Sequence, residues 1–226
     1  MEAIILENRL ELIYDAAGQL FINKGFARTQ MRDIAKEIGL STGMLYQYFT
    51  SKKDILSFIL KGTIDPEFFN REHHYPIDSH LFDDLDAEIM KTFEKNQAQF
   101  DNHLKNKDSD YSLAQMFSDA FDSISNYAIS CLIIEHNEDD LKKLSEYYRD
   151  YRKRFFNQVQ QYIQLFMEKD EFRKVESIPY TTRAVVESLA WWGMHLRYDA
   201  YETDKTISNE MAKKTCLDLL LHAYQK

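Results

Sequence analysis

The chain has 226 residues, of which 44% are hydrophobic and 29% charged, with a formal net charge of −9. These values are ordinary for a soluble protein, and no apolar run reaches the length of a membrane span. The two cysteines, Cys131 and Cys216, lie far apart without a CxxC pair, which argues against a disulfide framework or a zinc cluster. The apolar, acidic N-terminus lacks the basic start of a signal peptide, so we expect a cytoplasmic protein.

A first helix is predicted over residues 7–24. Its apolar residues recur at helical spacing and form one continuous stripe: Leu10, Ile13, Tyr14, Ala17, Leu20 and Phe21. Gly25 follows as the stop signal, and Phe26 is expected to fold back onto the helix end.

Residues 29–53 predict two short helices joined by a tight turn. The apolar face of the first of them consists of Ile34, Ala35 and Ile38. Gly39 comes next, where a helix often ends in the left-handed conformation that glycine adopts at low cost. Ser41 or Thr42 can cap a second helix that runs to about Phe49. This order is typical of a helix-turn-helix, whose second helix enters the major groove of DNA.

The second helix has the composition of a DNA reader. Leu45 and Phe49 can anchor it to a core, which leaves its other faces to Thr42, Gly43, Met44, Tyr46, Gln47 and Tyr48. A glycine permits close approach to a phosphate or base, and tyrosines can donate hydrogen bonds to phosphates. The alternative is that both tyrosines are half-buried packing residues.

Three flanking residues complete the predicted DNA contacts. Thr29 is expected to cap the first helix of the motif, and its hydroxyl or N–H could hold a phosphate; Gln30 is an adjacent candidate. Lys52 begins a further helix, where its ammonium could clamp a phosphate, although a lysine pair such as Lys52 and Lys53 is more often a solvated surface.

The order and spacing of these residues resemble the DNA-binding domain of the TetR (tetracycline-repressor) family of bacterial transcription regulators. The resemblance covers residues 8–62 and rests on Thr29, Asp33-Ile34-Ala35, Gly39-Leu40-Ser41, Leu45-Tyr46-Gln47-Tyr48-Phe49 and Ser51-Lys52-Lys53-Asp54-Ile55-Leu56. It implies an all-α homodimer that binds a palindromic operator and, in most members, releases it when a small molecule enters the second domain. It also places Lys52 at the family's phosphate clamp.

The negative charge lies almost entirely outside this segment. Residues 1–62 contain eight Lys and Arg against seven Asp and Glu, whereas the remainder contains 20 against 30. A near-neutral DNA-binding segment can still bind if its basic residues gather at the contact surface. Five of the six glycines precede residue 63 and all three prolines follow it, so we expect a three-helix helix-turn-helix domain over 1–62 and a ligand-sensing and dimerisation bundle over 63–226.

The second domain is expected to be helical after a loop over residues 65–80. Helices are predicted at 83–104, 112–134, 138–169, 180–201 and 208–224. Phe68 and Phe69 of the loop are expected to pack under the sensor domain. The last two helices carry more apolar surface than one chain can cover, which favours a homodimer interface, with a monomer built on one large core as the alternative.

A ligand pocket follows from analogy more than from residues. Residues 63–226 hold 24 aromatic residues, and the candidates to line a chamber are Phe117, Phe121, Tyr127, Tyr151, Phe155, Trp191 and Trp192. Ordinary core packing is the alternative for each of them. Gly193 could make room either for a ligand or for another helix.

The rival classes are an enzyme and a helical adaptor or small-molecule-binding protein that does not use DNA. No Glu-x-x-His, HExxH, glycine-rich phosphate loop or nucleophile elbow occurs, so we expect no enzyme, no cofactor and no metal site. The sequence therefore favours a DNA-binding regulator, a ligand-released repressor in the manner of the family it resembles.

Overall fold

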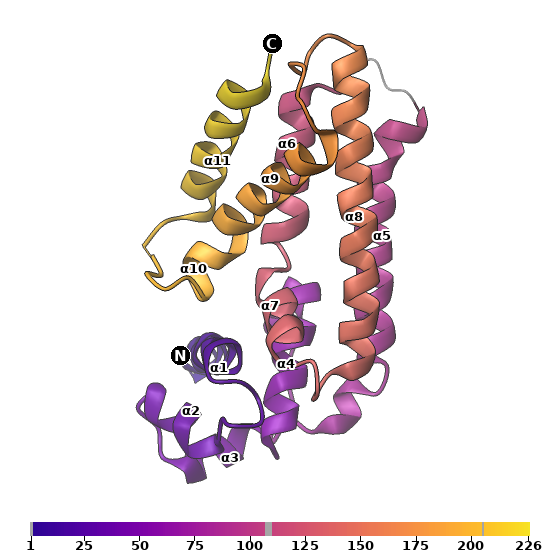
Figure 1. Cartoon of the computed structure of the whole chain (residues 1–226). Coiled ribbons are helices and arrows are strands. Elements are labelled where there is room, and N and C mark those ends of the chain that lie inside the picture. Colours follow the sequence, from indigo (N-terminus) through magenta and orange to yellow (C-terminus); the bar gives the residue numbers. More distant parts are fainter. Residues whose placement is uncertain (1, 107–109, 205) are drawn as a thin grey trace. The chain divides into compact units, whose positions relative to one another are not determined.

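The computed structural model describes residues 2–106, 110–204 and 206–226, and within them every regular element is helical (Figure 1). The elements are α1 (Glu2–Asn23), α2 (Met31–Glu37), α3 (Thr42–Tyr48), α4 (Lys52–Ile64), η1 (Pro66–Asn70), η2 (Ser79–Phe82), α5 (Leu85–Asn106), α6 (Leu113–Ser125), α7 (Ala128–His136), α8 (Lys142–Glu168), α9 (Ile178–Ala190), η3 (Trp191–His195), α10 (Leu196–Tyr198) and α11 (Asn209–Tyr224). The all-α prediction is confirmed. None of the described helices is both long and apolar enough to cross a bilayer.

The chain packs into two compact units. The first unit comprises Met1–Thr92 and Ile129–Ser145, and the second comprises Phe93–Ala128 and Glu146–Lys226. The first unit therefore contains the helix-turn-helix together with later segments of the chain, including most of α7. These units follow from packing alone, so the division of roles at residue 62 stays a prediction.

Helices α1 to α4 form the core of the first unit. The α1 stripe is buried as its spacing predicted, with Ile13, Ala17 and Phe21 fully inaccessible to solvent. Two glycines end helices in the left-handed region, Gly25 at φ 88° after α1 and Gly39 at φ 69° after α2. The turn before α2 and the turn after it therefore both depend on the residue type that tolerates this conformation.

The connection after α4 belongs to the first unit as well. Phe69 packs edge-on against Tyr14 of α1 and Phe58 of α4, with ring centroids 5.0 and 5.3 Å apart, and Phe68 packs against Phe58 at 5.5 Å. The expectation that Phe68 and Phe69 pack under the sensor domain is wrong, because both rings pack against Phe58 of α4 and Phe69 also packs against Tyr14 of α1. Further on, Ile77 lies beside the end of α3 in an isolated parallel bridge.

The second unit is built from the rest of α5 and α8, which lie side by side, and from α6, α9, η3 and α11 (Figure 1). The predicted helix 112–134 is divided into α6 and α7, which belong largely to different units, so the helix ends where its packing partners change. Within the predicted helix 180–201, η3 is a π-helical turn. A Cβ at Gly193 would lie 3.5 to 3.6 Å from side chains of α6, so this glycine makes room for another helix.

Candidate nucleic-acid interface

The turn between α2 and α3 has the geometry of a helix-turn-helix. After α2, the Leu40 N–H donates to the Ala35 carbonyl oxygen at 2.8 Å, which closes the turn through Gly39. Ser41 is the N-cap of α3, and its Oγ accepts the Met44 N–H at 3.2 Å. Of the two predicted caps, Ser41 rather than Thr42 is the one observed.

Helix α3 is anchored by Leu45, which is fully buried, and by Phe49 just beyond its end. Around the rest of α3, Gly43, Tyr46 and Gln47 are exposed, and Thr42 and Met44 are partly exposed. Tyr46 is 48% exposed, a high value for an aromatic side chain, and no neighbour lies nearer than 4.0 Å to a Cβ built on Gly43. Gln30 at the start of α2 is exposed as well. All of these residues can therefore contact DNA without any change in the fold.

Tyr48 is placed differently from the other predicted contacts. Its side chain is only 8% exposed, and its hydroxyl accepts a hydrogen bond from Arg9 Nη1 at 2.8 Å. Its ring packs edge-on against Tyr75, and its carbonyl oxygen accepts the Ile77 N–H at 2.8 Å. The packing alternative therefore holds for Tyr48, and a base contact from this side chain does not fit its position.

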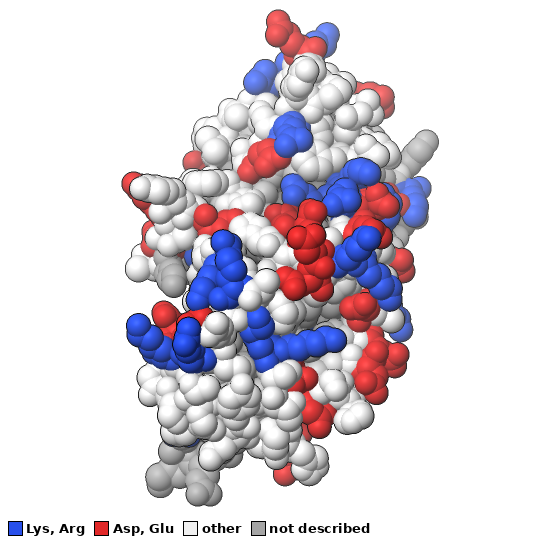
Figure 2. Space-filling view, turned by 60° about the horizontal axis from the view of Figure 1, so that its bottom comes forward, with Lys and Arg blue, Asp and Glu red and all other residues white. Residues whose placement is uncertain are grey.

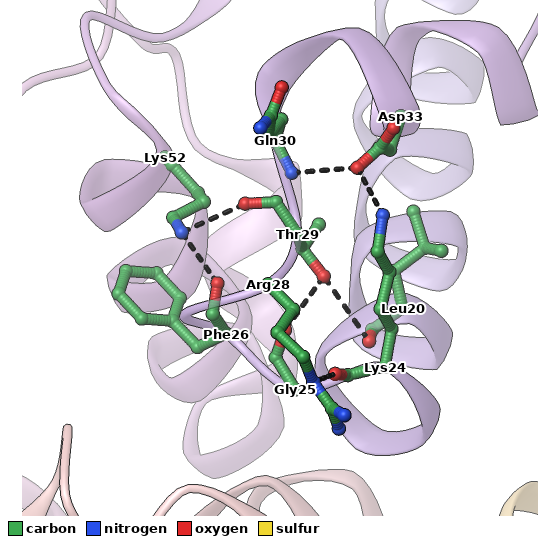
Figure 3. A network of polar contacts seen from close by, with 9 residues as sticks. All are labelled: Leu20, Lys24, Gly25, Phe26, Arg28, Thr29, Gln30, Asp33 and Lys52. Atoms are coloured by element: carbon green, nitrogen blue, oxygen red, sulfur yellow. Dashed lines mark hydrogen bonds and ion pairs between the residues drawn. The ribbon is translucent and has the colours of Figure 1, made fainter.

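Thr29 also lies inside the fold. It is 1% exposed, its hydroxyl donates to the Gly25 carbonyl oxygen at 2.8 Å, and its N–H donates to the same oxygen at 3.1 Å (Figure 3). The predicted phosphate contact does not fit, because both donors already have partners. The predicted cap is also wrong: Gln30 is the N-cap of α2, and its N–H donates to Asp33 Oδ2 at 2.9 Å.

Lys52 begins α4, after the N-cap Ser51, as predicted. Its ammonium donates to the carbonyl oxygens of Phe26 and Thr29, the latter at 2.8 Å, and lies 4.1 Å from the centre of the Phe26 ring (Figure 3). Burial lowers the pKa of Lys52, against a smaller raising effect of the Asp140 carboxylate. Two of the three N–H donors of the Lys52 ammonium therefore have partners within the protein.

Positive charge is available elsewhere in the first unit. Its exposed basic side chains include Lys24, Arg28, Arg32, Lys36 and Lys53. On the face shown in Figure 2, several Lys and Arg side chains lie close together. Lys24 is paired with Asp33 at 2.5 Å, and this hydrogen bond, with that of the Gln30 N–H, lowers the pKa of the Asp33 carboxyl.

The seven predicted ligand residues lie in different surroundings within the second unit. Phe117, Phe121 and Phe155 are core residues of the second unit with partly buried Trp192 packed against them. Tyr127 and Tyr151 instead pack on Phe93, with ring centroids 5.6 and 5.0 Å away, and Trp191 is 47% exposed.

A groove of the second unit lies elsewhere, between α5 and α8. Its volume is about 530 Å³, and polar or charged side chains line it, among them Gln97, Asp101, Arg154 and Gln158. None of the seven aromatic candidates lines this groove. No group of three or more potential metal ligands occurs among the described residues.

Two short helices joined by a glycine turn, with a capped second helix whose outer side is open, define a helix-turn-helix DNA-binding domain. Residues 13–57 match the family described as "Bacterial regulatory proteins, tetR family". This N-terminal segment is therefore similar to the DNA-binding domain of the TetR family.

The similar proteins carry the names of transcriptional regulators. Over 61 residues, 27% of either chain, the sequence is 43% identical to the HTH-type transcriptional regulator HbdR of Aromatoleum sp. (strain CIB). Over 60 residues, 26% of this chain and 29% of the relative, it is 42% identical to the HTH-type transcriptional repressor KstR2 of Rhodococcus jostii (strain RHA1). The match therefore spans less than a third of the length of these relatives.

The whole fold has a counterpart among solved structures. The ketosteroid transcriptional regulator KstR2 of Mycobacterium tuberculosis is similar with a TM-score of 0.52 and 17% identity, covering 96% of this chain and 95% of that one. At this identity the likeness concerns the fold alone. The second unit has the same kind of helical architecture as that regulator, with little shared sequence.

Proposed function

We propose that this protein is a DNA-binding transcriptional regulator that acts in the cytoplasm as a repressor and leaves its operator when a small molecule binds. Residues 1–62 supply the DNA contacts, and residues 63–226 supply ligand sensing and dimerisation. The observation that carries the proposal is the open side of α3 in a TetR-family domain: Gly43, Tyr46 and Gln47 are exposed while Leu45 holds the helix to the core.

The proposed contacts divide by chemistry. Tyr46 and Gln47 have donors and acceptors that can read base edges, and Gly43 allows close approach of the backbone. Gln30, Thr42 and Met44 flank them. Thr29 and Tyr48 support the domain from inside, as their internal hydrogen bonds require.

The proposed homodimer forms through α9 and α11. Both helices and η3 keep large apolar side chains at the surface: Tyr180 is 81% exposed, Met211 54%, Leu219 51% and Trp191 47%. Burying such side chains against their symmetry copies would remove apolar area from water. A two-fold dimer would offer two recognition helices to half-sites about 34–36 Å apart, which calls for a palindromic operator.

A small-molecule effector is proposed for the second unit. Its aromatic core offers apolar surface and its α5–α8 groove offers charged and amide groups, so the two regions favour different ligand chemistries. Such an effector must bind the DNA-free state more tightly than the DNA-bound state, since only a difference in affinity can shift the equilibrium.

Selection of genomic DNA fragments bound by the purified protein tests the proposal. We expect enrichment of an inverted repeat that the dimer binds at least 1,000-fold more tightly than unrelated DNA at the same salt concentration, in line with specific regulators (roughly 10³–10⁷). Compounds that release the enriched fragment then identify the effector class. If no sequence is enriched, the helical adaptor without DNA becomes the better explanation.

A further inference from the structure

The backbone N–H and carbonyl oxygen of Phe26 connect three segments of the first unit: the α1–α2 turn, the start of α4 and the end of α7. Phe26 lies in the turn between α1 and α2, directly after Gly25, whose φ of 88° sets the direction of the turn. The N–H of Phe26 donates to Asn137 Oδ1 at 2.5 Å, and its carbonyl oxygen accepts the Lys52 ammonium. One residue of the turn is thus held by α4 on one side and by the end of α7 on the other.

Asn137 is fully committed to this arrangement. It is 4% exposed and follows the last residue of α7. Its Nδ2 donates to the carbonyl oxygens of Phe21 at 3.0 Å and Ile133 at 2.8 Å, while its Oδ1 accepts the Phe26 N–H. Beside it, His136 Nδ1 lies 2.8 Å from the Ile22 carbonyl oxygen. The end of α7 therefore contacts the end of α1 and the turn after it through side-chain hydrogen bonds.

Lys52 holds the opposite side of the same turn. Its ammonium also takes the Thr29 carbonyl oxygen, one residue before the N-cap of α2, and rests over the Phe26 ring, which packs against Phe21 at 5.3 Å. Hydrogen bonds from a charged donor are stronger than neutral ones, and those at Lys52 are partly shielded from water. These contacts use two of the three N–H donors of the ammonium and hold it at the turn.

We propose that Lys52 and Asn137 act together as positioning residues that fix the α1–α2 turn, and with it the start of α2, for DNA binding. This inference rests on the proposed function and assigns Lys52 a role other than the predicted phosphate clamp. It also gives a displacement of α7 a direct route to the DNA-binding helices, because the same Phe26 peptide is tied to α7 and to α4.

The salt dependence of DNA binding separates the two roles of Lys52. A lysine that neutralises a phosphate contributes about 0.9 to the slope of log Kobs against log salt concentration, and its removal lowers the slope by about that amount. Lys52→Met keeps the length and the packing of the side chain but removes the charge. We expect operator affinity to fall roughly five-fold or more, with the slope unchanged. Lys53→Met, at the exposed neighbouring lysine, is the matched control for loss of one charge.

Asn137→Ala tests the other half of the arrangement. We expect it to weaken operator binding, and we expect the double variant with Lys52→Met to lose less than the product of the two single losses, because both act through one turn. Ser145→Ala is the control: the Ser145 hydroxyl is buried and donates to the Ile134 carbonyl oxygen at 3.1 Å, an acceptor outside the turn. It should lose stability without a matching loss of affinity.

Each outcome bears on the proposal. A slope lowered by about 0.9 in Lys52→Met makes Lys52 a phosphate contact and overturns the inference. If the loss of operator affinity in the double variant equals the product of the losses in Lys52→Met and Asn137→Ala, the two residues do not act through one turn, and the inference is overturned. Should Asn137→Ala fail to fold, amide exchange of Phe26 in Lys52→Met decides: faster exchange supports the coupling, and unchanged exchange contradicts it. If the parent protein binds no operator, the proposed function fails, and amide exchange still tests the turn.

Discussion

Replacing Gly62 by alanine should destabilise the first unit, although the change places a better helix former inside α4. A Cβ at Gly62 would lie 2.3 Å and 2.7 Å from two ring carbons of Phe69, far closer than ordinary van der Waals contact. The ring must move away from Tyr14 and Phe58, which it contacts edge-on. Lost aromatic contacts and burial cost about 2–4 kcal/mol, and the helix preference of alanine returns about 1 kcal/mol.

The expected net loss in the free energy of unfolding is therefore about 1–3 kcal/mol, measured by urea titration followed by far-UV circular dichroism. Gly43→Ala is the matched control, because its new Cβ has no neighbour nearer than 4.0 Å and it also lies in a helix of the first unit. That variant should match the parent or exceed it by up to about 1 kcal/mol. If Gly62→Ala proves as stable as Gly43→Ala, the tight packing of Phe69 against α4 is not what limits this position.

Three further predictions concern DNA binding, assembly and pH. Tyr46→Ala should reduce discrimination between operator and unrelated DNA by roughly 5- to 100-fold in fluorescence anisotropy at fixed salt concentration, and equal discrimination would remove Tyr46 from the reading surface. Leu219→Glu should convert the proposed dimer to single chains in sedimentation velocity, because it places a charge on the exposed apolar surface of α11; an unchanged dimer mass would move the interface elsewhere. Burial lowers the pKa of His73, so the unfolded state binds the proton more readily and stability is lost as the pH falls below the usual histidine value of about 6.5. The stability advantage of the parent over His73→Gln in urea titrations should shrink from pH 7.5 to 5.5, and an advantage that grows instead would contradict this sign.

Local patterns predicted the elements of the helix-turn-helix well. The apolar stripe of α1, the glycine turn before Leu40 and a hydroxyl cap on α3 each depend on residues within one or two helical turns. Such signals require no knowledge of distant partners, which is why they appear in the sequence. The family resemblance drew on the same residues and covered the same segment.

The roles of individual side chains at the site were harder to predict, because they depend on partners distant in sequence. Tyr48 is turned inward by Arg9, 39 residues earlier, and Lys52 is held by the Phe26 carbonyl oxygen, 26 residues earlier. Asn137 contacts the α1–α2 turn across 111 residues, and nothing near it in the sequence signals that contact. From the sequence alone, a polar residue at a helix end is predicted to be exposed to solvent, because its distant partners are not known.

The spacing of apolar residues also did not predict that the helix over residues 112–134 is divided into α6 and α7. The apolar spacing over residues 112–134 continues from Ile124 to Tyr127 and Ala128, yet one helix ends at Ser125 and a new one starts at Ala128. The sequence between α6 and α7 contains no glycine or proline that would predict this break. The break lies instead close to the point where the chain passes from the second unit to the first. The predicted ligand residues also differ in burial, since Trp191 is 47% exposed while Phe117 is buried in the core.

The central claim is that two copies of α3 read two half-sites of one operator at a fixed separation. The most direct measurement compares binding to the selected inverted repeat with binding to the same repeat after insertion of about five base pairs at its centre, half a turn of the double helix. The account predicts that the insertion lowers affinity to the level of a single half-site, because the second helix then faces the wrong side of the DNA. Equal affinity for both fragments would contradict it.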